Sequence, residues 1–249
     1  MGSYIPATRE ERQNMLETIG LTSIDQLYAI VPEEARVKNL DLPEGMSELE
    51  VAQKVSAMAE GNQQFRSIFR GAGAYRHYIP AIVKTVISKE EFQTSYTPYQ
   101  AEISQGVLQS IFEYQTQMCE LTGMDVSNAS VYDGPVAAAE AVFMCQERKR
   151  ATAIVSGAAD PQTIAVIKTY CESRDVPVVI LPVDNCATDL EALKATLSKE
   201  TAAVFVQSPN YYGVIEDMDA VVAATHEVGA KVIMGTNPIA MGLLKTPGE

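Results

Sequence analysis

The chain has 249 residues, 47% of them hydrophobic and 20% charged, and its net charge is −13. This length and apolar content suffice for one large domain, or for one domain with an added arm. A strongly acidic chain with scattered basic residues argues against nucleic acid or an anionic membrane surface as a partner. No signal peptide is recognisable, and no apolar run approaches the roughly 20 residues of a membrane-spanning helix.

Side chains that commonly bind metals are few. The chain has two histidines, and its four cysteines show neither a CxxC pair nor a Cys/His ligand spacing. We therefore expect no metal site. Unpaired thiols are typical of a reducing compartment, so we expect a cytoplasmic protein. The cysteines are Cys119, Cys145, Cys171 and Cys186.

Residues 1–60 are expected to form a helical N-terminal arm. Thr8–Glu11, Ser23–Gln26 and Ser47–Glu50 each fit the capping box, in which a hydroxyl and a carboxylate or amide satisfy free N–H groups at a helix start. An arm of this length is too short for a core of its own, so we expect it to wrap a partner or the main domain. Beyond the arm, a short helix is expected at Pro80–Ile87.

An aromatic and polar turn precedes the first long helix of the second part, residues 61–249. The helix is expected over Ser104–Leu121 and closed by Gly123. Pro98 restricts φ and favours an extended residue before it. Such a loop is a typical place for a small-molecule site, although a proline turn with a polar helix cap explains the same pattern. The candidate side chains are Tyr96, Tyr99, Gln100 and Glu102.

From Ala151 onward, short apolar strands alternate with helices. The expected strands are Ala151–Val155, Pro177–Leu181, Ala202–Val206 and Lys231–Met234. The expected helices are Pro161–Glu172, Leu190–Leu197, with a capping box beginning at Thr188, and Met218–Val228. This alternation predicts βαβ units and a parallel sheet, which defines an α/β class without defining a function.

Three further motifs have a functional and a structural reading. Asp133, Gly134 and Pro135 begin an alanine-rich helix whose free N–H groups suit a phosphate, or else a tightly packed helix capped by Asp133. The Asp133 carboxylate would repel a phosphate. Tyr75 and His77 lie among glycines and aromatic residues, where a histidine either packs structurally or stacks on a cofactor ring. Gln207–Gly213 follows a strand, as ligand loops do, and also fits a Pro–Asn turn.

Pyridoxal-phosphate enzymes with such a sheet need a strand-end Asp for the pyridine nitrogen and, further along, a lysine for the Schiff base. Here the strand Lys231–Met234 leads to Asn237, and Lys245 is the lysine that follows. The sequence therefore predicts no convincing Schiff-base lysine in this chain.

The runs Phe69–Pro80, Thr94–Gly106 and Cys119–Asp125 resemble glycine decarboxylase, the P-protein family of the glycine cleavage system. The match is to subunit 1 (alpha) of the two-subunit glycine dehydrogenase (decarboxylating), and it covers nearly the whole chain. The resemblance implies the large domain of pyridoxal-phosphate-dependent transferases of fold type I, which are aspartate aminotransferase-like. That domain has a parallel-rich sheet, here with a helical N-terminal arm.

The resemblance also implies a cofactor and partners. Pyridoxal phosphate would be bound to a lysine of subunit 2 (beta) in an α2β2 assembly, which releases CO2 from glycine and passes the aminomethyl group to the lipoyl H-protein. This chain would supply no catalytic residue of its own. Asp133, Gly134 and Pro135 would form at most a vestigial phosphate cup. The residues expected to line the partner's active site are Tyr96, Tyr99, Gln100, Glu102, Tyr75 and His77.

The sequence departs from the family pattern in three respects. Family subunits continue beyond Glu249 into a small C-terminal domain, so residues 61–249 are expected to be an incomplete large domain. Pro135 stands where an alanine is usual, and Gly157 and Asn237 replace an expected Arg and Asp. Two alternatives stay open: a truncated, non-catalytic structural or interaction homologue, or an independent fold-type I enzyme whose lysine lies in a missing C-terminal part.

Overall fold

The computed structural model describes residues 7–37, 39, 41–73, 75–94 and 100–249, which belong to two compact units, residues 1–66 and 67–249. The regular elements described in the first unit are helical. They are α1 (Arg9–Thr18), the 3-10 helices η1 (Ile24–Tyr28) and η2 (Glu33–Ala35), and α2 (Glu48–Glu60). The capping boxes predicted at Thr8 and Ser47 are confirmed. Leu16 is the buried apolar side chain among the described residues of this unit, so the unit has little core.

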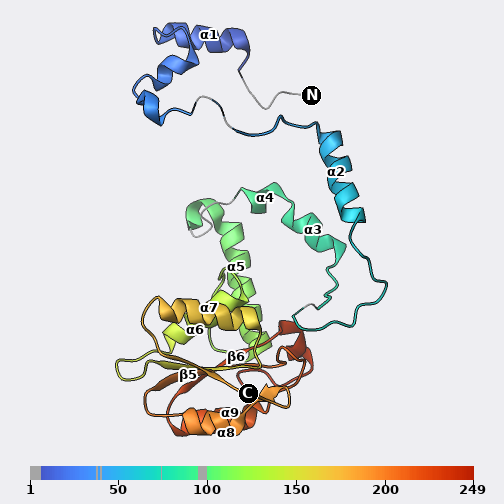
Figure 1. Ribbon diagram of the computed structural model, residues 1–249, viewed down its shortest axis with the longest axis vertical. Helices are drawn as coiled ribbons and strands as arrows, with labels where there is room; N and C mark the ends of the chain where they lie inside the picture. Colours follow the sequence, from blue (N-terminus) through green and yellow to red (C-terminus); the bar gives the residue numbers. More distant parts are fainter. Residues whose placement is uncertain (1–6, 38, 40, 74, 95–99) are drawn as a thin grey trace. The chain divides into compact units, whose positions relative to one another are not determined.

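The second unit contains a parallel sheet and the helices that cover it (Figure 1). Its strands are β1 (Thr152–Ser156), β2 (Val178–Leu181), β3 (Val183–Asp184), β4 (Ala187–Thr188), β5 (Thr201–Gln207) and β6 (Lys231–Gly235). Its helices are α3 (Ala81–Ile87), α4 (Glu90–Gln93), α5 (Ala101–Thr122), α6 (Gly134–Met144), α7 (Pro161–Glu172), α8 (Leu190–Thr196), α9 (Met218–Glu227) and the 3-10 helix η3 (Pro238–Gly242). None of the helices in the described part of the chain is long and apolar enough to cross a membrane.

The main sheet has the strand order β2-β1-β5-β6, with every neighbouring pair parallel. Successive side chains alternate between its faces. Ala153 and Val155 pack with α6 and α7 on one face, whereas Ile154 packs with α8 and α9 on the other. Figure 1 shows these helix pairs on opposite sides of the sheet. Burial of both faces of β1 and β5 explains why these two strands read as continuous apolar runs, and the predicted α/β class is confirmed.

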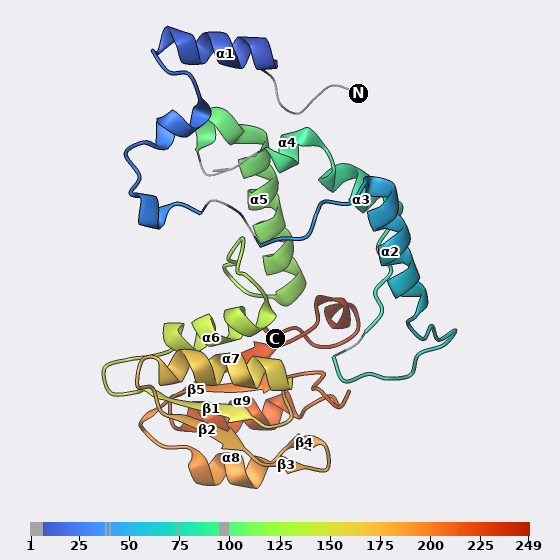
Figure 2. The same cartoon turned by 45° about the horizontal axis from the view of Figure 1, so that its top comes forward.

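The structure also corrects the sequence-based boundaries. The capping box predicted to begin at Thr188 is wrong, because the N-cap of α8 is Asp189, whose Oδ1 accepts a hydrogen bond of 2.9 Å from Ala192 N. Thr188 instead ends the antiparallel hairpin β3–β4, which the sequence did not predict (Figure 2). The long helix α5 starts three residues earlier than expected and is kinked at Ser104, where φ is −121° and ψ is 33°. Gly123 closes α5 at φ +69°, as predicted.

Gly157, at the end of β1, is tightly enclosed. A Cβ atom built on it would lie 2.4 Å from the backbone oxygen of Leu181 in β2, and this oxygen cannot move without disturbing the sheet. We expect Gly157→Ala to lower the free energy of unfolding by about 1–3 kcal/mol, as measured by urea denaturation. Gly134→Ala is the matched control, because a Cβ atom there meets nothing within 4 Å. Equal losses in the two variants would contradict this account.

Candidate functional site

The carboxyl ends of β1, β5 and β6, here called the strand-end edge, are where an open parallel sheet binds ligands. β1 continues through α7 to β2, whereas β5 continues through α9 to β6 on the other side of the sheet. A ligand is therefore expected between the loops that follow β1 and β5. In this chain the two loops bond to each other. Gln207 Oε1 accepts from Asp160 N at 2.8 Å, and Tyr211 N donates to Ala158 O at 3.0 Å.

A cluster of buried polar side chains lies beneath these loops. Its members, here called the buried polar cluster, are Ser156, Thr188, Ser208, Asn210 and Glu216. Both carboxylate oxygens of Glu216 accept from Thr188 N, at 3.2 and 3.1 Å, and Oε1 also accepts from Asn210 Nδ2 at 2.7 Å. The Ser156 and Thr188 hydroxyls lie 2.7 Å apart, and Ser208 Oγ accepts from Glu216 N at 3.2 Å. A buried carboxylate is tolerated only when it is hydrogen-bonded in this way.

Asn210 is the centre of that cluster and is fully buried. Its Nδ2 group donates to Glu216 Oε1 and to Cys186 O, at 2.7 and 2.8 Å. Its Oδ1 accepts from Tyr212 N and Val214 N, at 3.0 and 3.1 Å. The two donors and two acceptor positions of the amide are thus all used. Of the two readings of Gln207–Gly213, the structure supports a turn held from inside; a ligand role for its outer side chains stays a prediction.

His77 and Tyr75 lie on a segment that reaches the strand-end edge. Nε2 of His77 is 3.3 Å from Nδ2 of Asn237, the residue two positions after β6. Gly73, at φ +79°, is close enough to Tyr211 that a Cβ atom on it would lie 3.9 Å from the ring carbon Cε2. Tyr75 and His77 themselves are exposed. The structure therefore brings His77 to Asn237, a contact that sequence spacing alone did not predict.

The other predicted lining residues precede or begin α5 in the sequence. Tyr96 and Tyr99 lie outside the described residues. Gln100 is exposed and forms the N-cap position of α5, with the extended dihedrals φ −80° and ψ 100°. Glu102 lies in the first turn of the helix. Their role as lining of a partner's active site stays a prediction.

At the start of α6, the Asp133 carboxylate takes the place that a phosphate would use. Asp133 Oδ1 accepts from Val136 N at 2.8 Å, which confirms the predicted cap. Gly134 and Pro135 are the first two residues of the helix, and open space surrounds Gly134. A phosphate here would face a carboxylate instead of free N–H groups. A vestigial phosphate cup stays a prediction.

The groups that a fold-type I enzyme uses to hold pyridoxal phosphate do not fit this chain. After β6, Asn237 offers an uncharged amide, and its Oδ1 already accepts from Ile239 N at 3.0 Å. A pyridine nitrogen would find no carboxylate there. Lys245 Nζ lies 3.3 Å from Asp219 Oδ2, and both side chains are exposed. The residues after β6 thus supply neither the acid nor a lysine aimed at the strand-end edge.

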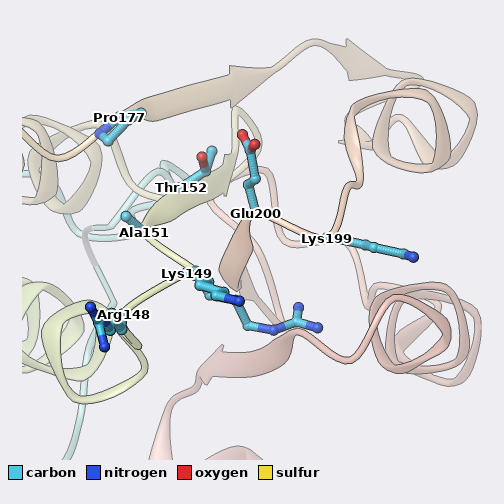
Figure 3. Close-up of a pocket in the computed structure, with 8 residues that line it drawn as sticks. Arg148, Lys149, Ala151, Thr152, Pro177, Lys199 and Glu200 are labelled. Atoms are coloured by element: carbon cyan, nitrogen blue, oxygen red, sulfur yellow. The ribbon is translucent and has the colours of Figure 1, made fainter.

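A basic hollow of about 690 Å³ lies at the opposite edge, by the amino ends of the strands. Its lining includes Arg148, Lys149, Arg150, Lys199 and Glu200. Arg150 is held by the carbonyls of Thr201 and Val228. Figure 3 shows Arg148 and Lys199 on opposite sides of the hollow, so the cations do not converge. Val228 is the C-cap of α9, so the Arg150 cation offsets the dipole of that helix. Within the described residues, no group of acidic, histidine or cysteine side chains suits a metal ion.

Comparison with known proteins gives a consistent result. The sequence model of a family described as "Glycine cleavage system P-protein" matches residues 2–249. The chain is 46% identical to "Probable glycine dehydrogenase (decarboxylating) subunit 1" of Geobacillus kaustophilus (strain HTA426), over 98% of this chain and 56% of that protein. It is 45% identical to the protein of the same name from Bacillus subtilis (strain 168), over 99% of this chain and 56% of that protein. The chain thus spans little more than half the length of these relatives.

Solved structures agree. A crystal structure of glycine decarboxylase (P-protein) of the glycine cleavage system, in inhibitor-bound form, superposes with a TM-score of 0.90 and 37% identity, over 99% of this chain and 56% of that chain. A sphingosine-1-phosphate lyase of Burkholderia pseudomallei superposes with a TM-score of 0.56 and 15% identity, over 83% of this chain and 50% of that one, which shows a shared fold alone. The predicted fold-type I architecture is confirmed.

The four cysteines differ in burial, and we expect their thiols to differ in reactivity accordingly. Burial raises the pKa of the Cys145 thiol, with Glu147 adding to the rise and Lys231 opposing it, and burial also raises the pKa of Cys171. Cys186, in the turn of the β3–β4 hairpin, is exposed. Because the thiolate is the reactive form, we expect iodoacetamide at pH 8 to alkylate Cys186 well before Cys145 and Cys171. Peptide mass spectrometry over time measures the order, and early labelling of Cys171 would contradict the packing of α7.

Proposed function

Because the chain belongs to the glycine cleavage system P-protein family, we propose that it acts as the non-lysine subunit, subunit 1 (alpha), of a glycine decarboxylase. The observation that carries this proposal is the strand-end edge. There the loops after β1 and β5 bond to each other, and Asn237 stands where a cofactor-binding enzyme needs an acid. A chain of this fold that lacks its own cofactor site contributes to catalysis if it completes the active site of another subunit.

The partner in this proposal is a lysine-bearing beta subunit that carries pyridoxal phosphate. The relatives are named subunit 1, which supports the existence of a second subunit. Glycine is the substrate, and the lipoyl arm of the H-protein accepts the aminomethyl group that remains after CO2 leaves. Four cysteines free of disulfides support a cytoplasmic location.

In the proposed assembly this chain shapes the partner's active site and takes no covalent part in the reaction. Tyr75 and His77 are exposed on the segment that reaches the strand-end edge, so they are available to a neighbouring subunit. Tyr96, Tyr99, Gln100 and Glu102 precede or begin α5 and complete the proposed lining. Hydrogen-bonding groups and aromatic faces of this kind orient a small ligand and exclude water.

Reconstitution tests the proposal directly. We expect a mixture of this chain with a lysine-bearing beta subunit and lipoyl H-protein to release CO2 from carboxyl-labelled glycine, whereas neither subunit alone does so. His77→Ala should lower kcat/KM by about tenfold, because a lost lining contact misplaces the substrate. His226→Ala is the matched control, since His226 is an exposed residue in the last turn of α9. A mixture without CO2 release would favour the alternative of a structural or interaction homologue.

The second alternative, an independent pyridoxal-phosphate enzyme, makes a different prediction. We expect the purified chain, titrated with pyridoxal phosphate, to give no saturable internal-aldimine absorbance, because Lys245 pairs with Asp219 and no acid awaits the pyridine nitrogen. A saturable band that borohydride fixes onto Lys245 would overturn the partner-site proposal. Free lysine at the same concentration gives the background of non-specific imine formation.

A further inference from the structure

Glu216 is a buried carboxylate that the proposed function leaves unexplained. It is 7% exposed, and no lysine, arginine or histidine of the described residues forms an ion pair with it. Its oxygens accept instead from Thr188 N and Asn210 Nδ2. Burying a charge without a counter-charge costs free energy. We therefore expect Glu216 to have a role beyond filling space.

We propose that Asn210 and Glu216 are positioning residues, which fix Tyr211 and, through it, the segment that carries His77. This proposal rests on the proposed function for its effect on catalysis, because His77 is a proposed lining residue. Its structural part stands on the geometry alone. Neither residue touches the proposed substrate; each acts through the loop that follows β5.

The first step runs from Asn210 to the aromatic pair. Asn210 Oδ1 accepts from the backbone N–H of Tyr212 and of Val214, and Asn210 N donates to Val214 O at 2.9 Å. The loop is therefore closed around one buried amide. Tyr211 is also fixed from β1, because its N–H donates to Ala158 O. Its ring meets that of Tyr212 edge to face, with centroids 5.6 Å apart and planes at 79°.

The second step runs from Tyr211 to His77. Gly73 approaches the Tyr211 ring at a positive φ that only glycine adopts without strain, and His77 follows four residues later. The imidazole then reaches Asn237 at the end of β6. The segment thus lies beside the strand-end edge at two described points, with Gly73 near the Tyr211 ring and His77 within 3.3 Å of Asn237. One of them, Tyr211, belongs to the loop that Asn210 holds.

The hydrogen-bond donors and acceptors of Asn210 and Glu216 explain why an amide and a carboxylate are needed at these two positions. The Glu216 carboxylate offers acceptors alone, which matches the two N–H groups that face it from Thr188 and Asn210. Glu216→Gln replaces one carboxylate oxygen with an NH2 group. In either orientation of the amide, this donor faces another N–H donor, from Thr188 or Asn210. Asn210→Asp removes both Nδ2 donors and sets a second carboxylate at the position 2.7 Å from Glu216 Oε1. Combining the two substitutions lets the Gln amide donate to the Asp carboxylate and restores one hydrogen bond.

Histidine NMR of the full chain tests the structural part, because the chain has two histidines. We expect Asn210→Asp, Glu216→Gln and Tyr211→Ala to move the Cε1–H resonance of His77 in the direction that Asn237→Ala moves it. The resonance of His226 on α9 should stay in place. The double variant should return the His77 resonance toward its wild-type position.

Val142→Ala is the matched control for lost stability, because Val142 is buried with α6 and α7 on the other face of the sheet. A residue that merely stabilises the fold would behave like Val142: the melting temperature would fall and the His77 resonance would stay. That outcome for Asn210→Asp, Glu216→Gln and Tyr211→Ala overturns the proposal. Tyr211→Ala keeps the test decisive if the buried variants unfold, because Tyr211 is only half-buried.

Reconstitution with the beta subunit then tests the functional part. We expect Tyr211→Ala and Glu216→Gln to lower kcat by up to about tenfold, no more than His77→Ala does, with a smaller change in KM, because the lining is misplaced while the substrate still binds. If wild-type mixtures release no CO2, the proposed function fails while a shifted His77 resonance still supports the positioning role. If CO2 release is normal in variants whose His77 resonance has moved, the positioning role has no functional effect and this part is overturned.

Discussion

The strand-end edge depends on the solvation of one buried carboxylate by protein groups. Glu216 is 7% exposed, and backbone and amide N–H groups drawn from separate segments take the place of most of the water around its carboxylate. These segments are the hairpin β3–β4 and the loop after β5, while Ser208 links the same residue to the end of β5. None of them can move far without leaving an acceptor unpaired, which is expensive in a low-dielectric interior. The order of the β3–β4 hairpin and of the loop after β5 therefore depends on this one electrostatic requirement.

The sheet itself follows from a simpler rule, and for this reason the sequence predicted it. Strands covered on both faces must be apolar throughout, and the helices between them must carry one apolar stripe. Ile154 and Val155 are neighbours in β1 and are both fully buried, on opposite faces. Such a pattern can be read from neighbouring residues in the sequence, without knowing which helices pack against the strand. The four strands and their helices were accordingly placed to within a few residues, and Gly123 was identified as the end of α5.

The site was less predictable because its contacts join residues far apart in the chain. The hairpin β3–β4 has strands of two residues, too short for a period to emerge, and Thr188 was mistaken for a helix cap. His77 and Asn237 are separated by 160 positions, so no spacing rule links them. Gln207–Gly213 was recognised as a motif, yet the sequence could not tell that Asn210 faces inward. The turn at Pro98 is a predicted small-molecule site, but its two tyrosines lie outside the described residues.

The saturation of Asn210 also has an evolutionary consequence. An amide with all its hydrogen-bonding positions filled couples its neighbours, so a change at Asn210, Glu216 or the Cys186 turn is tolerated only together with a compensating change. The Tyr212 side chain is free of this hydrogen-bond coupling, because the cluster bonds to the backbone of Tyr212 and not to its ring. Inherited variation should therefore collect at the exposed Tyr212 ring, while the interior changes rarely and in pairs. Such a loop can acquire a new binding preference without losing its shape.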